Sequence, residues 1–330
     1  MNPCFLCPRH CGVSRPESRA DAPSPLPGCC RSPRLPVVAR AGLHFWEEPV
    51  LSGSRGAGAV FFSGCNLRCV YCQNYSISSG GSGEEISVAR LREIYRELAA
   101  RGAHNLDLVT PTHFADAVLA SLDPAPPLPV VWNSNAYESV ETLRRLGGRV
   151  AIYLPDLKYA DDELASRYSG AADYFERATA AIREMFRQTG PFEIGDDGVL
   201  RRGVVIRHLI LPGYVKNSLA VIRWVAENFR PGEVLFSLMR QYLPCGAVDA
   251  EHFPELNRRV SAREYHRVEK ALFDSGIEDG FVQEPQSASC EFIPLFDGSG
   301  VLPPADPPPF AHGRCPAPAS AGCRPAHDHY

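Results

Sequence analysis

Runs of apolar residues alternate with amphipathic segments along most of the chain. Short apolar runs bounded by glycine, proline or polar residues predict buried strands, and apolar residues three or four positions apart predict helices. The predicted strands are residues 59–62, 106–109, 128–132, 150–154, 203–211 and 233–238. The predicted helices are residues 87–102, 114–122, 139–146, 173–187 and 218–229, and one that opens with the capping-box pair Ser261 and Glu264. This alternation predicts parallel strands joined by helical crossovers, in a partial or whole α/β barrel or a doubly wound sheet.

The composition changes at both ends of this α/β region. Residues 1–36 hold a cysteine cluster and a proline- and serine-rich stretch, which together indicate a metal-binding segment and a linker. From residue 303 onward the chain is rich in proline, which is typical of a disordered tail. The predicted organisation is therefore a Cys-rich segment over 1–36, a barrel domain over 37–302 and a tail over 303–330.

Composition and charge narrow the functional classes. The 330-residue chain is 45% hydrophobic and 22% charged with a net charge of −4, which is ordinary for a globular enzyme and disfavours nucleic acid as a partner. Its apolar stretches are too short to span a membrane, and its N-terminus lacks the apolar core of a secretory signal. The twelve cysteines are clustered, which favours metal ligation in a reducing compartment. A cytoplasmic location is predicted.

Three cysteines follow the first predicted strand. Cys65, Cys69 and Cys72 have the spacing C-x3-C-x2-C. Three thiolates can bind three irons of a [4Fe–4S] cluster, which normally takes four cysteines, and so leave one iron open to another ligand. The alternatives are a chance cluster and part of a zinc site, although zinc prefers paired C-x2-C units and four closed ligands. The spacing favours the iron–sulfur interpretation.

A second cysteine cluster lies near the N-terminus. Cys4, Cys7 and Cys11, with Cys30 or its neighbour Cys29, could supply four sulfur ligands to zinc or to another iron–sulfur centre. The alternative is a set of free thiols in a mobile segment. A metal is the favoured interpretation, and its identity stays open.

Polar residues recur at the carboxyl ends of the predicted strands, where barrel enzymes carry their active sites. They are Thr110, Thr112, His113, Asn133, Asp156, Lys158 and Arg207. Such groups suit a zwitterionic cofactor that carries a ribose, because Asp156 could bind a ribose hydroxyl while Lys158 or Arg207 balances a carboxylate. Polar strand ends are also ordinary turns and caps. Lys158 could equally pair with Asp161 or Asp162 at the surface.

Several longer motifs extend these signals. They are Cys4–Gly12, Leu43–Pro49, Gly64–Tyr75, Val109–Phe114, Tyr153–Tyr159 and Arg207–Gly213. Through them the chain resembles the radical S-adenosylmethionine (SAM) proteins related to pyruvate formate-lyase activating enzyme, in a poorly characterised branch. The resemblance runs from about Cys4 to about Val301.

The resemblance implies a partial (β/α)6 TIM-like barrel with an N-terminal Cys-rich extension. It implies that Cys65, Cys69 and Cys72 bind a [4Fe–4S] cluster, that Tyr71 lies near the adenine of SAM, and that Asp156, Lys158 and Arg207 surround SAM. The chain departs from the family pattern at two places. Thr110–His113 stands where many relatives have a Gly-Gly-Glu type run, and Asn135-Ala136 stands where relatives tend to carry a glycine.

The reaction implied by the resemblance is reductive cleavage of SAM to a 5′-deoxyadenosyl radical, which abstracts a hydrogen atom from a substrate. A glycine of a partner enzyme is one candidate substrate, and a small molecule or RNA is another. The resemblance also implies an electron donor of the flavodoxin or ferredoxin type. The competing interpretation is a non-enzymatic iron–sulfur or zinc protein that serves as an electron carrier or scaffold.

Overall fold

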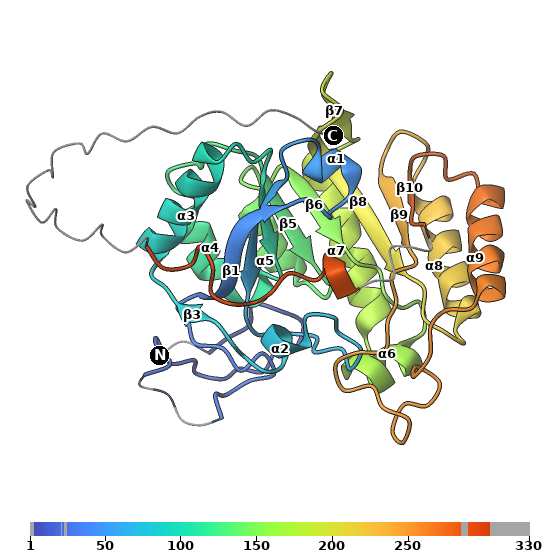
Figure 1. Ribbon diagram of the computed structural model, residues 1–330, viewed down its shortest axis with the longest axis horizontal. Coiled ribbons are helices and arrows are strands. Elements are labelled where there is room, and N and C mark those ends of the chain that lie inside the picture. The colour runs from blue at the N-terminus through green and yellow to red at the C-terminus, as the bar shows by residue number, and fades with distance from the viewer. Residues whose placement is uncertain (1–2, 21, 23–24, 285–289, 304–330) are drawn as a thin grey trace, which may run out of the picture.

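The protein is described by a computed structural model over residues 3–20, 22, 25–284 and 290–303 (Figure 1). Its centre is a run of parallel strands, each hydrogen-bonded to the next. In spatial order they are β2 (Ala57–Phe62), β4 (Leu106–Val109), β5 (Val130–Ser134), β6 (Ile152–Pro155), β8 (Leu200–Leu209), β9 (Leu235–Met239) and β10 (Gly280–Val282). The predicted fold class, an open and mostly parallel α/β sheet of the partial-barrel type, is confirmed.

Helices connect the strands and cover the outside of the sheet (Figure 1). They are α3 (Val88–Ala100), α4 (Ala115–Ser121), α5 (Val140–Leu146), α6 (Asp162–Ser169), α7 (Tyr174–Thr189), α8 (Val215–Asn228) and α9 (Ala262–Asp274). The Ser87 and Ser139 side chains cap α3 and α5 by accepting backbone N–H groups. Ser261 and Glu264 form the predicted capping box at the start of α9.

The first two central strands are buried along their whole length. Every residue of β2 and β4 is buried, because helices cover the outer face and side chains fill the inside of the barrel. This burial on both faces explains why the strands appear in the sequence as continuous apolar runs.

The hydrophobic pattern did not predict four strands. They are β1 (Val37–His44), β3 (Glu84–Glu85), β7 (Glu193–Ile194) and β10. β1 pairs antiparallel with β2, and its arginine and glycine interrupt the apolar run. The other three contain only two or three residues, which is too short for a periodic signal. The short elements α1 (Pro49–Ser52), α2 (Tyr75–Ser78), η1 (Thr112–Phe114) and η3 (Cys290–Phe292) complete the assignment.

The C-terminal part of the described chain runs along β1 (Figure 1). Gly298 N–H donates to the Ala39 carbonyl at 3.0 Å, and Ala41 N–H donates to the Ser299 carbonyl at 2.9 Å. The Phe296 ring packs edge-on against Phe61, with 5.4 Å between ring centroids. This segment therefore covers part of a strand edge that would otherwise expose its backbone groups.

The predicted domain boundaries stay a prediction, and the predicted tail from residue 304 onward lies outside the described residues. Within the described ranges, no helix combines the length and apolar character that crossing a membrane requires.

Candidate active site

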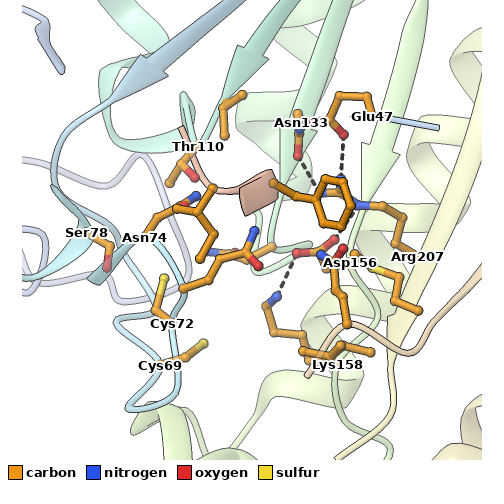
Figure 2. Close-up of a pocket in the computed structure, with 18 of the residues that line it drawn as sticks. Glu47, Cys69, Cys72, Asn74, Ser78, Thr110, Asn133, Asp156, Lys158 and Arg207 are labelled. Atoms are coloured by element: carbon orange, nitrogen blue, oxygen red, sulfur yellow. Dashed lines mark hydrogen bonds and ion pairs between the residues drawn. The ribbon is translucent and has the colours of Figure 1, made fainter. Parts of the chain in front are cut away.

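A cavity of about 290 Å³ lies inside the partial barrel (Figure 2). One part of its wall is the loop after β2, which contributes Cys65, Cys69 and Cys72. Another part is formed by polar residues on the strands or at their ends: Thr110, Asn133, Asp156, Lys158 and Arg207. The structure thus brings the cysteine triplet and five of the predicted polar residues to one enclosed space.

The path of the cysteine loop depends on Gly64. This residue has a φ of 84°, in the left-handed region that favours glycine, and a Cβ there would approach the Cys30 carbonyl to 2.8 Å. Val70 N–H then donates to the Tyr168 carbonyl at 2.9 Å, which ties the loop to the end of α6. The Arg9 side chain of the N-terminal segment donates to the carbonyls of Asn66 and Ser169 at 2.8 Å each. The N-terminal segment therefore helps to hold the loop.

Hydrogen-bond donors point at two of the cysteine sulfurs. Leu67 N–H and the Asn135 amide donate to Cys65 Sγ at 3.3 and 3.4 Å, and Ser169 O–H donates to Cys69 Sγ at 3.0 Å. Burial raises the pKa of Cys65 to about 11, and it also raises the pKa values of Cys69 and Cys72. Because burial disfavours bare thiolates, these sulfurs need a cationic partner before they ionise.

This donor set fits a [4Fe–4S] cluster. Donors to thiolate sulfur are among the features by which proteins tune such clusters. No group of three His, Cys, Asp or Glu side chains among the described residues could hold one metal ion, a result that includes these cysteines. That is compatible with a cluster, in which each cysteine binds a different iron.

Asp156 joins the two cationic side chains of the cavity (Figure 2). Its carboxylate accepts from Lys158 Nζ at 2.6 Å and from Arg207 Nε at 2.7 Å. Burial opposes ionisation of Asp156, but Arg207 and Lys158 outweigh that cost and lower its pKa. Lys158 therefore bonds Asp156 inside the cavity, and the alternative of a surface pair with Asp161 or Asp162 is not adopted.

Thr110 and Ala136 adopt backbone conformations that are rare for their residue types. Their φ values are 59° and 61°, and both lie in loops beside the cavity. Strained backbone of this kind concentrates at functional sites. Ala136 stands where the family pattern has a glycine, which is the residue that this conformation favours.

The structure turns two predicted cofactor ligands away from the cavity. Thr112 donates to Glu138 Oε1 at 2.6 Å, and His113 Nε2 lies 2.8 Å from the Ser63 carbonyl oxygen. Both side chains are buried, and neither lines the cavity. The reason is the η1 turn, which directs them into the packing between strands. Thr112 and His113 therefore make packing contacts in this structure, and their cofactor role stays a prediction.

Burial of Glu138 in this packing makes the free energy of unfolding depend on pH. Burial raises its pKa from an ordinary value of 4.5 to about 7, against hydrogen bonds from Thr112 and Trp132. A carboxyl with a raised folded-state pKa destabilises the fold as pH rises from the unfolded value to the folded value. We expect Glu138→Gln to increase the free energy of unfolding on the order of 3 kcal/mol at about pH 8, and by little at about pH 4. Urea unfolding at both pH values measures this difference.

The matched control for Glu138 is Glu176→Gln, an exposed carboxylate on α7. It should change the free energy of unfolding by less than about 0.5 kcal/mol at both pH values. A Glu138→Gln protein that is no more stable than wild type at about pH 8 would contradict the raised pKa.

Tyr71 lies on the wall of the cavity beside the cysteines. It is buried, and its hydroxyl donates to the Tyr159 hydroxyl at 2.7 Å. Its ring also meets Tyr242 at 6.0 Å between centroids. The aromatic face is therefore held in place, while its adenine contact stays a prediction.

Sequence reasoning singled out only part of the acidic side of the cavity. The motif Leu43–Pro49 makes His44 and Glu47 either site groups or a buried structural pair, and both line the cavity, as does Glu48. Burial lowers the pKa of His44 to about 4, with help from Arg40 and Arg207. Asp107, buried in β4, gives no signal in the sequence because it sits within an apolar run and outside the motifs.

The N-terminal cysteines approach one another without forming a metal site. Burial raises the pKa of Cys7 to about 12, and Cys30 and Cys4 lie close enough to add to the shift. Cys11 is exposed. Among the described residues no three ligand side chains are placed to hold one ion, and the four-sulfur site stays a prediction.

Comparison with known proteins gives a family and distant structural neighbours. A model described as the radical SAM superfamily matches residues 59–225, about half of the chain. The uncharacterized protein MJ0674 of Methanocaldococcus jannaschii is 29% identical over 284 residues, which cover 82% of this chain and 73% of that protein.

Among solved structures, methylornithine synthase (PylB) is 15% identical and has a TM-score of 0.45, over 73% of this chain and 70% of that one. HydG from Carboxydothermus hydrogenoformans is 15% identical and has a TM-score of 0.46, and the match covers 69% of this chain and 54% of HydG. Streptococcus suis SuiB bound to S-adenosylmethionine is 12% identical and has a TM-score of 0.45, and the match covers 67% of this chain and 48% of SuiB. This chain therefore spans about half the length of SuiB. The family match covers β2, the cysteine loop and the strand ends on which the cavity is built, and the chain belongs to the radical SAM superfamily.

Proposed function

We propose that this chain is a radical SAM enzyme that cleaves S-adenosylmethionine reductively and abstracts a hydrogen atom from a substrate. One observation carries the proposal: the cysteine triplet, with donors aimed at its sulfurs, opens on the same cavity as the Asp156–Lys158 pair. An electron carrier or scaffold needs the cysteines but has no use for a polar cavity beside them.

Cys65, Cys69 and Cys72 would hold the cluster, which together with SAM supplies one-electron chemistry and the 5′-deoxyadenosyl radical. Among the described residues, the Lys158 ammonium donates only to Asp156, and it keeps donors for a ligand carboxylate. Its charge also acts on Cys65, Cys69 and Cys72, so it is the cation closest to the proposed cluster.

Unlike Lys158, Arg207 uses its guanidinium to bind other side chains of the protein. Its guanidinium donates to Asp156 at 2.7 Å, to Glu47 at 2.9 Å and to Asn133 at 2.7 Å. It is therefore engaged by the protein on three sides, and it orients Asp156 so that the remaining carboxylate lone pairs face the cavity. Asp156 can then accept a hydrogen bond from a ribose hydroxyl. Its position on the cavity wall beside Lys158 supports this role.

The test is anaerobic reconstitution of the full chain with iron and sulfide, followed by reduction with dithionite in the presence of SAM. We expect 5′-deoxyadenosine and methionine to form in a reaction that requires both the reductant and the cluster. A protein with a full, reducible cluster that forms neither product would overturn the proposal and favour the carrier interpretation.

Within this function, a glycine of a partner enzyme is one candidate substrate, and the sequence resemblance alone supports it. A purified glycyl-radical enzyme added to the same reaction would show a protein-based radical by electron paramagnetic resonance if that candidate holds. Its absence, with 5′-deoxyadenosine still forming, would exclude that partner as the substrate.

The remaining partners are also part of the proposal. A flavodoxin or ferredoxin is the expected electron donor, because the chemistry needs one low-potential electron for each SAM. A cytoplasmic location suits clustered thiols that must stay reduced to bind iron. A zinc or second iron–sulfur centre at Cys4, Cys7, Cys11 and Cys30 would require these thiols to close together, and metal analysis of a Cys7→Ala protein tests it.

A further inference from the structure

The cavity has two chemically different ends. Glu47 and Glu48 precede α1, which lies at one end of β2, while the cysteine loop follows the other end of that strand (Figure 1). The six residues of β2 span about 20 Å. Glu47 and Glu48 reach back into the barrel from the α1 side and line the cavity. We call Glu47 and Glu48, together with the buried Asp107 beside Glu47, the acidic end.

The acidic end has more carboxyl groups than cations. Arg207 is its charged partner, at 2.9 Å from Glu47 Oε2 and 3.9 Å from Glu48 Oε2. Lys158 is engaged by Asp156, and Asp156 also takes Arg207 Nε. Three carboxyl groups of the acidic end therefore share a guanidinium that Asp156 and Asn133 already occupy.

Two carboxyl oxygens at this end lack a hydrogen bond within the described part of the chain. They are Glu48 Oε2 and Asp107 Oδ1. Both residues are buried, with Glu48 7% exposed and Asp107 0% exposed. Glu48 does not use its carboxylate to cap α1, although it holds the N-cap position, and it faces the cavity instead. Glu48 lines the cavity, whereas Asp107 is not among the lining residues and its other oxygen accepts from Asn133 at 3.3 Å. A buried carboxyl oxygen without a hydrogen bond is costly, so Glu48 Oε2 on the cavity wall indicates a missing partner.

The electrostatics agree with this geometry. Burial raises the pKa of Glu48 to about 7, against Arg207 and with help from Glu47. Burial also raises the pKa values of Glu47 and Asp107, which lie beside each other. A cation that entered the cavity would lower the pKa values of these carboxyl groups and let them ionise. Its attraction to the carboxylates would offset part of the free energy lost by burying them.

We infer that the acidic end binds a positively charged nitrogen, an ammonium or guanidinium group, of a small-molecule substrate. This inference rests on the proposed function, because it names the substrate class for that reaction. A divalent metal ion does not fit, because no three acidic, histidine or cysteine side chains among the described residues could hold one ion, and Arg207 lies among the carboxylates. A nitrogen cation needs only one or two carboxylate oxygens and suits a cavity of about 290 Å³.

The experiment uses calorimetric titration of the reconstituted, SAM-loaded full chain with isosteric probes. We expect n-butylammonium and ethylguanidinium to bind at least about tenfold more tightly than neutral n-butanol, which corresponds to about 1.4 kcal/mol. Glu48→Gln should weaken n-butylammonium binding by at least about tenfold while binding of n-butanol stays the same. The control variant Asp274→Asn removes a carboxylate that is 62% exposed on α9 and should bind like wild type.

Each outcome decides between the interpretations. If n-butylammonium binds wild type no more tightly than n-butanol, or if Mg²⁺ displaces it competitively, the cation subsite is wrong. If Glu48→Gln does not fold, the comparison of charged and neutral probes on wild type still decides, with Glu47→Gln as the second variant. Formation of 5′-deoxyadenosine without cation preference overturns only the subsite. Cation preference without SAM cleavage supports the subsite and overturns the proposed reaction.

Discussion

Cys69→Ala should lose the cluster and, with it, SAM cleavage. We expect the rate of 5′-deoxyadenosine formation to fall by more than about 100-fold, because even the loss of an outer partner of a metal ligand can cost that much. Cys69 also accepts the Ser169 hydroxyl at 3.0 Å, so the substitution removes this hydrogen bond and leaves Ser169 with Tyr159 as its hydroxyl partner at 2.8 Å. The measurements are iron and sulfide content, the visible absorbance of the cluster and product formation after reduction.

The matched control is Cys11→Ala, whose thiol is exposed and does not line the cavity. It should keep the wild-type rate of SAM cleavage. Wild-type iron content and SAM cleavage in the Cys69→Ala protein would mean that the triplet is not the ligand set. A conservative Ser169→Ala variant separates the two roles of this region. It should keep the iron but shift the reduction potential of the cluster, since hydrogen bonds to sulfur tune that potential.

Arg207→Met should be the most destabilising substitution among the charged cavity residues. Its guanidinium is the shared partner of Asp156 and Glu47, and its side chain is only 12% exposed. Removing one member of a buried ion pair leaves uncompensated charge and typically costs about 3–5 kcal/mol. We expect a loss of that size in the free energy of unfolding at about pH 8, measured by urea titration.

The pH dependence of this loss has a definite sign. In wild type, Arg207 and Lys158 lower the pKa of Asp156 against the effect of burial. Without Arg207, the folded-state pKa values of Asp156 and Glu47 rise, so the folded variant binds more protons than wild type. Its deficit in stability should therefore shrink as the pH falls from about 8 to about 5. A deficit that stays constant or grows would contradict this account.

The control for Arg207 lies on the same strand. Arg202 pairs with Glu193, and its side chain is 49% exposed. Exposed ion pairs contribute little, so Arg202→Met should cost less than about 1 kcal/mol at either pH. Equal losses for the two variants would show that side-chain packing on β8, and not buried charge, sets the effect.

The departure from the family pattern at Asn135-Ala136 can be described from the structure. Ala136 keeps the left-handed conformation, with a φ of 61°, at a place where relatives tend to have glycine. A Cβ is therefore present in a conformation that favours glycine. Asn135 next to it donates to Cys65 Sγ at 3.4 Å, a contact that no motif pattern indicated. At this site the chain thus combines local backbone strain with a donor to the cysteine loop.

The sequence by itself determined the central strands except β10, the main helices except α6, and the cysteine loop. These features depend on local signals: β2 and β4 are buried on both faces and so are continuously apolar, and Ser87, Ser139 and Ser261 cap their own helices. The spacing of Cys65, Cys69 and Cys72 is likewise local, because one short loop carries all three. Periodicity and spacing suffice where the interacting groups are neighbours in the chain.

Only the tertiary structure decided which polar side chains face the cavity. Thr112 and His113 follow the same strand as Thr110, yet a single 3-10 turn directs them into packing contacts. Arg207 meets Glu47 across 160 positions of sequence, a pairing that no local pattern encodes. Asp107 lies in an apolar stretch of β4, so the sequence gives no sign of its role. Its pKa is raised by burial and by Glu47, which lies beside it in the folded chain. A side chain's direction and its distant partners depend on how the strands are assembled, and those determine the chemistry of this site.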